Sequence, residues 1–250
     1  MTATVYLVGA GPGAPDLITL RAARLLEAAD IVFYDALVHE DTIALAKNAE
    51  KVAVGKRYGK HSAAQLFINK RLVDAAHKYK TVVRLKGGDP MLFGRAQEEI
   101  EALTQAGIAV EVVPGITAAL AASADLGISL TRRGLSRSVA FATPRVGREE
   151  QPSDWAASLI NADTGVLYMA AHEAQEIAAQ LVSRGKSSDT PVMVVENASL
   201  GSRQLVTTLA AMAREGLPAL EGPALLMLGE VYREALDASL AAAPAQAAQR

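Results

Sequence analysis

The sequence predicts an α/β protein made of two domains. Short runs of β-branched and other apolar residues alternate with stretches rich in alanine and leucine, as in sheets whose faces are covered by helices. The alternation restarts near residue 138, and the stretch PGITAALAASADLGISL at 114–130 is typical of a turn followed by a helix. We therefore expect an N-terminal α/β domain at residues 1–116 and a C-terminal α/β domain at residues 117–240.

Five predicted strands make up the N-terminal domain, and their alternation with helices indicates a mostly parallel sheet. The strand segments are VYLVGA at 5–10, ADIVFYD at 29–35, KVAVGK at 51–56, TVVRLKGGDP at 81–90 and AVEVVPGIT at 109–117. Two helices have clear limits. Thr19 is a good N-cap for LRAARLLEAA, and Gly107 stands where a C-cap would end AQEEIEALTQ.

The C-terminal domain repeats the pattern with four more predicted strands. These are SVAFATP, TGVLYMA, TPVMVVENA and PALLMLGEVY, with helical stretches between them. Residues 241–250 are rich in alanine and have no apolar face to bury, so we expect a frayed, disordered tail there.

Composition excludes several classes of protein. The 250 residues are half hydrophobic and carry a formal net charge of −2, which argues against a strongly basic nucleic-acid binder. The chain has no cysteine, so disulfides, thiolate zinc sites and a cysteine nucleophile are excluded. Its four histidines lack metal-ligand spacing, and we expect no metal. With no signal core and no apolar run of membrane-spanning length, we expect a cytoplasmic enzyme with no membrane partner.

Distinctive loops, four of them containing glycine, follow the five strands of the N-terminal domain. They read GAGPGAPD, YDALV, GKRYG, GGDPMLFGR and PGITAA. Ligands of open α/β sheets bind beyond the carboxyl ends of the strands. Five such loops in one topological position therefore predict one shared ligand cleft, although an isolated GGDP would more often be a turn with an Asx cap.

The first loop also fits the spacing of a dinucleotide-binding turn at Gly9, Gly11 and Ala14. That motif needs a helix that begins inside the glycine turn and faces the pyrophosphate. Here Pro12 and Pro15 interrupt the segment, and the best helix start is the later Thr19. We therefore favour another ligand and keep an NAD-dependent oxidoreductase as the alternative from a different class.

Taken together, the motifs resemble the tetrapyrrole methyltransferase family, which uses S-adenosylmethionine. The likeness is carried, in the family's order, by VGAGPGAPDLIT, VFYDALV, VGKRYGKH, LKGGDPMLFGR, VVPGITAA, SLTRRG, LYMA and VVENAS. It is greatest for the members that methylate uroporphyrinogen III. A methylase of a later corrin precursor, a methylase of protein or RNA, and a non-catalytic ligand-binding module stay open as alternatives.

The resemblance implies two α/β domains with the active-site cleft between them, and a homodimer. It implies two methyl transfers, to C2 and C7 of uroporphyrinogen III, giving precorrin-2 via precorrin-1 and leaving S-adenosylhomocysteine. Sirohaem, cobalamin and haem d1 lie downstream. The printed sequence ends after the methylase pattern, and we expect methylation only.

The resemblance also assigns site residues position by position. The expected cofactor contacts are Pro12, Gly87, Gly88, Asp89, Thr117, Ala118, Met169 and Ala198. The expected catalytic residues are Asp35 and Lys56, as proton acceptor and donor, and Arg95. Glu98, Arg132 and Arg133 are expected at the substrate. Because the substrate carries eight carboxylates, arginine forks are suited to bind it, and Arg133 is foremost.

Each assignment has a simpler structural alternative. Asp35 could cap a strand end, Lys56 could be solvated surface, and Met169 could fill the core. Arg95 and Glu98 lie one helical turn apart and could form a surface ion pair. The chain also departs from the family at three places, with Arg132 for a common histidine, Ala198 for a glycine, and Pro144-Arg145 for Gly-His.

Overall fold

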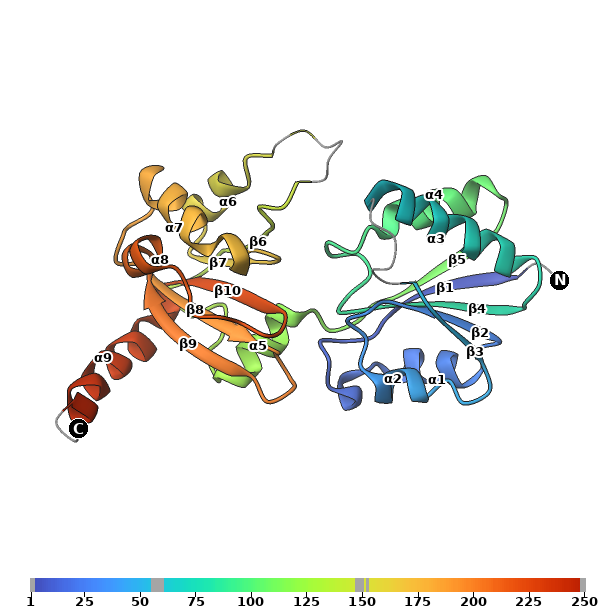
Figure 1. The fold of residues 1–250 in the computed structure, drawn as a ribbon, viewed down its shortest axis with the longest axis horizontal. Coiled ribbons are helices and arrows are strands. Elements are labelled where there is room, and N and C mark those ends of the chain that lie inside the picture. The colour runs from blue at the N-terminus through green and yellow to red at the C-terminus, as the bar shows by residue number, and fades with distance from the viewer. Residues whose placement is uncertain (1–2, 55–60, 147–150, 152, 248–250) are drawn as a thin grey trace. The chain divides into compact units, whose positions relative to one another are not determined.

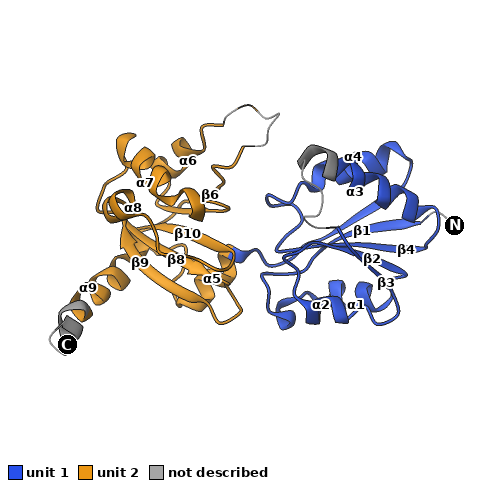
Figure 2. Ribbon diagram, viewed as in Figure 1, with its two compact units in different colours: residues 1–118 blue, residues 119–250 orange. Residues whose placement is uncertain are grey.

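The computed structural model of the chain describes residues 3–54, 61–146, 151 and 153–247 (Figure 1). It divides into two compact units, Met1–Ala118 and Ala119–Arg250 (Figure 2). Each unit has its own five-stranded sheet. Lys56, one of the expected catalytic residues, lies outside the described residues. No helix in the described part of the chain is both long and apolar enough to cross a membrane.

The sheet of unit 1 is entirely parallel, as predicted. Its strands are β1 (Thr4–Gly9), β2 (Ile31–Tyr34), β3 (Glu50–Ala53), β4 (Thr81–Lys86) and β5 (Ala109–Val113). They lie in the order β3-β2-β4-β1-β5. All five match the predicted segments. The inner strands β1, β2 and β4 are mostly buried and read as largely apolar runs, whereas the edge strand β3 is mainly exposed.

Helices cover both faces of this sheet. On one side lie α1 (Leu20–Glu27) and α2 (Glu40–Ala44), and on the other α3 (His61–Ala76) and α4 (Ala96–Gln105) (Figure 1). Alternate strand residues divide between the two cores. Val5 and Val82 pack with Leu72 of α3, whereas Val8 and Val83 pack with Leu26 of α1. Beyond α4, Gly107 adopts φ +72°, the left-handed conformation predicted for its C-terminal cap.

The start of α1 confirms the predicted cap. Pro15–Leu17 form a short 3₁₀ helix, and α1 begins only after Thr19, whose hydroxyl accepts a hydrogen bond from the Ala22 amide at 3.2 Å. The helix therefore does not begin inside the first glycine turn. This geometry disfavours the dinucleotide alternative, which needs the helix terminus there.

Removing this cap is expected to weaken α1. In Thr19→Ala the Ala22 amide loses its partner, and we expect the free energy of unfolding to fall by about 1 kcal/mol. Urea denaturation followed by circular dichroism measures the change. Thr19→Ser keeps the accepting oxygen and should stay within about 0.5 kcal/mol of the original protein. Equal losses in the two variants would contradict the capping role.

Unit 2 contains a mixed sheet, which differs from the mostly parallel pattern expected from the sequence. Its strands are β6 (Val139–Ala142), β7 (Thr164–Leu167), β8 (Pro191–Glu196), β9 (Arg203–Thr208) and β10 (Ala224–Gly229), in the order β6-β7-β10-β8-β9. Only β6 and β7 pair in parallel. The sequence prediction missed β9, a half-polar edge strand that follows β8 after a short loop. A short loop is compatible only with antiparallel pairing.

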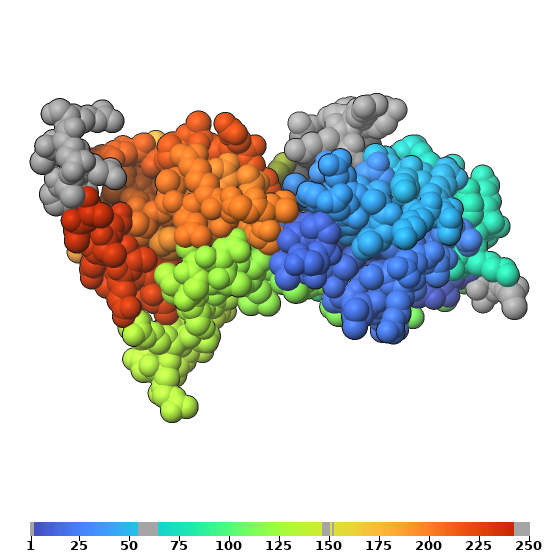
Figure 3. Space-filling view, turned by 90° about the horizontal axis from the view of Figure 1, so that it is seen from below, coloured from blue at the N-terminus to red at the C-terminus, as the bar shows by residue number. Residues whose placement is uncertain are grey.

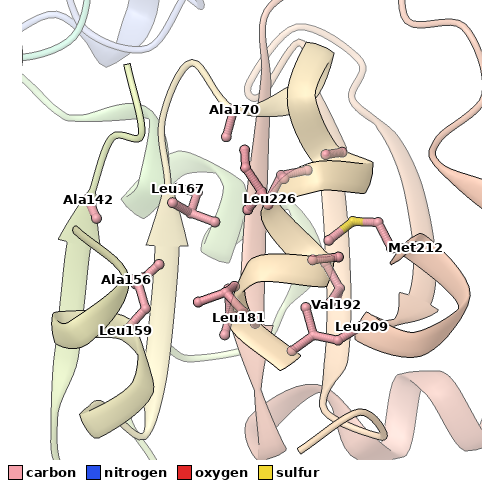
Figure 4. Close-up of a cluster of buried hydrophobic side chains, with 14 of the residues drawn as sticks. Ala142, Ala156, Leu159, Leu167, Ala170, Leu181, Val192, Leu209, Met212 and Leu226 are labelled. Atoms are coloured by element: carbon pink, nitrogen blue, oxygen red, sulfur yellow. The ribbon is translucent and has the colours of Figure 1, made fainter. Parts of the chain in front are cut away.

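The core of unit 2 lies between its sheet and α6 (Trp155–Asn161), α7 (Ala174–Ser183) and α8 (Leu209–Glu215) (Figure 4). Leu159, Leu181 and Met212 from these helices are fully buried against Leu167 and Leu226 of the strands. On the other side of the sheet lies α5 (Ala118–Leu126), the helix predicted after the PGIT turn (Figure 1).

The C-terminal segment differs from its prediction. Residues 230–232 form a 3₁₀ turn, Glu230–Tyr232, and α9 then runs from Arg233 to Ala247. Residues 241–247, which we expected to be a disordered tail, thus continue a helix. Alanine has the highest helix propensity of the common residues, so such a segment needs no buried face of its own to be helical.

Candidate functional site

Two glycine loops join at the carboxyl edge of the unit 1 sheet. The loop after β1 and the loop after β4 form an isolated bridge, in which the Gly88 amide donates to the Gly11 carbonyl at 2.7 Å and the Gly11 amide donates to the Gly88 carbonyl at 3.2 Å. Both glycines have positive φ, 80° and 68°. The chain leaves β1 toward α1 on one face and leaves β4 toward α4 on the other. Such a topological switch point is where open α/β sheets bind ligands.

A third loop, after β5, packs against the first two. A Cβ atom on Gly9 would lie 2.6 Å from both the amide nitrogen and the Cα of Gly115, and 2.8 Å from the Gly88 carbonyl oxygen. No side chain fits there, so backbone approaches backbone directly. Three of the five loops predicted to share a cleft are therefore in contact. Gly9 and Gly115, which make that contact possible, were not among the predicted site residues.

Asp89 holds this arrangement through both carboxylate oxygens. Its Oδ2 accepts the Gly115 amide at 2.9 Å, and its Oδ1 accepts the Met91 amide at 2.8 Å. The second bond is the Asx-type cap that we considered for an isolated GGDP turn. Since an ionised carboxylate has about four lone-pair sites, Asp89 can tie the loops together and still accept a donor from a ligand.

Four other predicted cofactor residues of unit 1 lie around these loops. Pro12 follows Gly11 and is half-buried. Gly87 faces the loop after β2, where its Cβ position is 3.2 Å from Leu37 Cβ. Thr117 Cα lies 4.0 Å from the Cβ position of Gly88, and Ala118 opens α5. The structure therefore gathers the predicted unit 1 residues along one edge of the sheet.

Asp35 stands at the same edge, directly after β2. Its Oδ1 accepts a hydrogen bond of 2.6 Å from Nη2 of Arg84, and its side chain is 31% exposed. The Arg84 side chain on β4 is only 2% exposed. The charged partner of Asp35 is therefore the almost fully buried Arg84.

A buried charge cluster underlies this pair. Glu99 of α4 is fully buried and accepts hydrogen bonds from Arg84 Nε at 3.0 Å, from Lys86 Nζ at 3.0 and 3.1 Å, and from Gln65 Nε2 at 3.2 Å. Sequence reasoning missed these residues. A signal was available in TVVRLK, where two cations share one face of an apolar strand and therefore require a buried partner.

Burial lowers the pKa values of the two cations, and the neighbouring carboxylates raise them. Burial by itself lowers the pKa of Arg84, but the charges and hydrogen bonds of Glu99 and Asp35 outweigh it, and the pKa is raised overall. Burial and the charge of Arg84 lower the pKa of Lys86, and Glu99 offsets only part of that effect.

Arg95 and Glu98 form the predicted pair on one face of the α4 start. Arg95 Nε donates to Glu98 Oε1 and its Nη2 to Oε2, each at 2.7 Å, and both side chains are partly exposed. The backbone is unusual here, because Phe93 and Arg95 have positive φ values of 54° and 57°. Such conformations cost free energy and are concentrated at functional sites.

In unit 2, Met169 follows β7 in an exposed position. It has φ +56° and is 49% exposed, so it does not fill the core. The hydroxyl of its neighbour Tyr168 accepts the Ala119 amide at 3.2 Å, which ties the start of α5 to the end of β7. Ala198 is buried between Asn197 and Ser199, which have φ values of 55° and 70°.

The two predicted substrate arginines differ in their surroundings. Both lie in the loop after α5, which projects from unit 2 in yellow-green in the space-filling view (Figure 3). Arg132 Nη1 donates to Glu234 of α9 at 2.7 Å. Arg133 is exposed and makes no hydrogen bond or ion pair with any residue that the structure describes. Arg133 is therefore the better placed of the two to meet an anionic ligand.

Comparison with known proteins places the chain in a family. The family model of tetrapyrrole (corrin/porphyrin) methylases matches residues 4–213, most of the chain. The chain belongs to the tetrapyrrole methylase family. Membership confirms the resemblance drawn from the strand-end loops, and the two-domain α/β fold accords with it.

Individual relatives of this tetrapyrrole methylase include single enzymes and longer proteins. It is 44% identical to the uroporphyrinogen-III C-methyltransferase of Pseudomonas aeruginosa, over 94% of this chain and 96% of that one. It is 47% identical to the siroheme synthase of a Psychrobacter species, over 92% of this chain. There it covers only 48% of the relative, so the chain spans about half the length of the siroheme synthases it matches.

A solved structure supports the same grouping. The uroporphyrin-III C-methyl transferase of Thermus thermophilus, complexed with S-adenyl homocysteine, is 40% identical to this tetrapyrrole methylase. The two agree with a TM-score of 0.80 over 92% of this chain and 99% of that one.

Proposed function

We propose that this tetrapyrrole methylase is an S-adenosylmethionine-dependent uroporphyrinogen-III C-methyltransferase. The observation that carries the proposal is the 44% identity to the Pseudomonas enzyme of that name across nearly the full length of both chains. The Thermus relative bound to S-adenyl homocysteine supports the choice of cofactor. Methylation would take place at C2 and then at C7, giving precorrin-1 and then precorrin-2.

The loops of unit 1 fit such a cofactor. Gly9 and Gly115 leave no room for side chains between the loops, so the backbones of the loops meet directly at this edge. When bound, S-adenosylmethionine supplies a methyl group activated by a sulfonium, and no protein nucleophile is required. The residues have to place the reacting pyrrole carbon in line with that methyl, which is a matter of proximity and orientation.

The proton balance assigns a role to Asp35. Each transfer forms a carbon–carbon bond, breaks the sulfur–methyl bond and releases one proton from the macrocycle. Asp35 is partly exposed at the carboxyl edge and is held by Arg84, so it is positioned to accept that proton. Arg133 and Arg95 would receive the substrate's carboxylates, and Glu98 would hold the Arg95 side chain in place.

Product analysis tests the activity. The purified chain is incubated anaerobically with uroporphyrinogen III and methyl-labelled S-adenosylmethionine, and we expect two labelled methyl groups per macrocycle. If a labelled product forms only when a later corrin precursor is supplied, that precursor replaces uroporphyrinogen III as the proposed substrate. Calorimetric titration separates the alternative class, because binding of NAD without binding of S-adenosylhomocysteine would indicate an oxidoreductase. Cofactor binding with no turnover of any tetrapyrrole would indicate a binding module.

Two variants should separate catalysis and substrate binding from cofactor binding. Asp35→Asn is expected to lower kcat by about 100-fold or more, since general-base assistance contributes that much. Arg133→Met should raise KM for uroporphyrinogen III by about tenfold, because a charge-assisted hydrogen bond is lost. Both should bind S-adenosylhomocysteine as the original protein does.

The control is Arg24→Met, a change at an exposed arginine on α1, which should leave kcat, KM and cofactor affinity unchanged. Equal loss of turnover and cofactor affinity in both variants would contradict these roles.

We also propose a homodimer in the cytoplasm, on the strength of the family resemblance. Sedimentation velocity of the purified chain should give one species of twice the chain's 26.2 kDa. A monomer that retains full turnover would remove the dimer from the proposal.

A further inference from the structure

Strand β4 carries two cations on a face that is otherwise apolar. Arg84 and Lys86 are two residues apart and point to the side on which α3 and α4 pack, together with Val82. Their side chains are 2% and 4% exposed. Isolated charges in such a position are costly unless they are paired and hydrogen-bonded. The groups that pair with Arg84 and Lys86 therefore indicate the role of these buried charges.

Glu99 is the shared partner of both cations and is itself fully buried. One of its oxygens accepts from Arg84, Lys86 and Gln65, and the other accepts from Lys86. Gln65 also donates to Asn69 of α3 at 3.0 Å, and Asn69 donates to the Glu98 carbonyl at 3.1 Å. The carboxylate is thus fixed from α3, α4 and β4 at once.

Arg84 extends from this buried carboxylate to the ligand edge of the sheet. Its Nε donates to Glu99, its Nη1 donates to the Leu85 carbonyl at 3.2 Å, and its Nη2 donates to Asp35. The planar guanidinium is therefore held at two nitrogens inside the core and presents the third to Asp35. Oδ2 of Asp35 accepts no hydrogen bond from the residues that the structure describes.

We propose that Arg84 is a positioning residue for Asp35, and that Glu99 and Lys86 hold Arg84 in the orientation this requires. The inference rests on the proposed function, in which Asp35 accepts the proton. Arg84 binds one carboxylate oxygen and leaves the other for the substrate. Lys86 balances Glu99, so the two cations and two carboxylates together are neutral.

The charge balance suggests a variant that should fold. In Arg84→Met, Lys86 and Glu99 remain paired in the interior, and Asp35 is exposed enough to be hydrated. The Asp35 carboxylate then loses its anchor. We expect kcat to fall by about 10- to 100-fold, as for a misplaced catalytic group. KM for uroporphyrinogen III and the affinity for S-adenosylhomocysteine should change by less than about twofold, a difference of about 0.4 kcal/mol.

A double-mutant cycle tests whether Arg84 acts through Asp35. The variants are Asp35→Asn, Arg84→Met and the two combined, with Lys70→Met on the exposed face of α3 as the control. If the inference holds, kcat of the double variant equals that of Asp35→Asn, because a residue without its target has nothing left to position. Losses that multiply in the double variant would overturn it. Should Arg84→Met not fold, Arg84→Lys serves in the same cycle, since it keeps the charge but removes the three-nitrogen fork.

The original protein distinguishes this inference from the proposed function. If it methylates uroporphyrinogen III but the cycle is multiplicative, only the positioning role of Arg84 is overturned. If it binds S-adenosylhomocysteine but does not methylate uroporphyrinogen III, the proposed substrate is overturned, and the role of Arg84 in that reaction is overturned with it.

Discussion

Glu99→Gln is expected to lower the free energy of unfolding by about 3–5 kcal/mol, because removing one partner of a buried ion pair leaves an uncompensated charge. The glutamine has nearly the same shape and can still accept hydrogen bonds. It cannot neutralise Arg84 and Lys86, whose side chains are almost fully buried. Only the partly exposed Asp35 would then remain as a negative charge beside two cations. Urea denaturation followed by circular dichroism measures the loss.

The neighbouring residue offers a matched control. Glu98→Gln makes the same change one position earlier on α4, at a side chain 47% exposed, and should change stability by less than about 1 kcal/mol. Glu99→Gln combined with Lys86→Met restores the charge balance and should be more stable than Glu99→Gln alone. If Glu99→Gln and Glu98→Gln have equal effects, the cluster is not a buried charge network.

Gly9→Ala is expected to reduce binding of S-adenosylhomocysteine by about 10- to 100-fold, equivalent to about 1.4–2.8 kcal/mol. Gly9 does not have positive φ, so its backbone conformation is open to alanine. The obstacle is contact alone, since the new methyl would lie 2.6 Å from the Gly115 backbone. The loops after β1 and β5 must then move apart, which should also cost about 1–3 kcal/mol of stability. Calorimetric titration measures the affinity.

Gly107→Ala is the control for this prediction. Gly107 has φ +72° and no atom within 4 Å of its Cβ position, so alanine there strains the backbone without touching another segment. We expect a stability loss of about 1 kcal/mol and unchanged cofactor affinity. Wild-type affinity in Gly9→Ala would show that the contact between the loops does not shape the cofactor site.

Local chemistry made much of unit 1 predictable. Its three inner strands, β1, β2 and β4, are largely buried and mainly apolar because helices cover both faces of the parallel sheet. Thr19 and Gly107 mark helix ends because their roles depend on the chain within three or four residues of them. The glycine loops were predictable as a group because the carboxyl ends of parallel strands all lie at one edge.

Unit 2 was less predictable because its pairing is not local. β9 reads RQLVTT, a half-polar segment at the sheet edge whose side chains are at most half-buried. Its status as a strand comes from pairing with β8 along the whole of its length. The direction of each pair in this mixed sheet likewise depends on which strands become neighbours, and no residue pattern in a single segment encodes that choice.

The sequence by itself determined the α/β class, the strand-end loops and the family to which the chain belongs, because these depend on local patterns in a set order. Tertiary structure alone decided which side chains meet. Arg84 and Lys86 lie on β4, Glu99 lies on the helix after it, and Asp35 directly follows β2. Only the pairing of β2 with β4 brings Asp35 to Arg84. A buried charge is stable only beside a specific partner, so the role of Arg84 could be inferred only once its contacts were known.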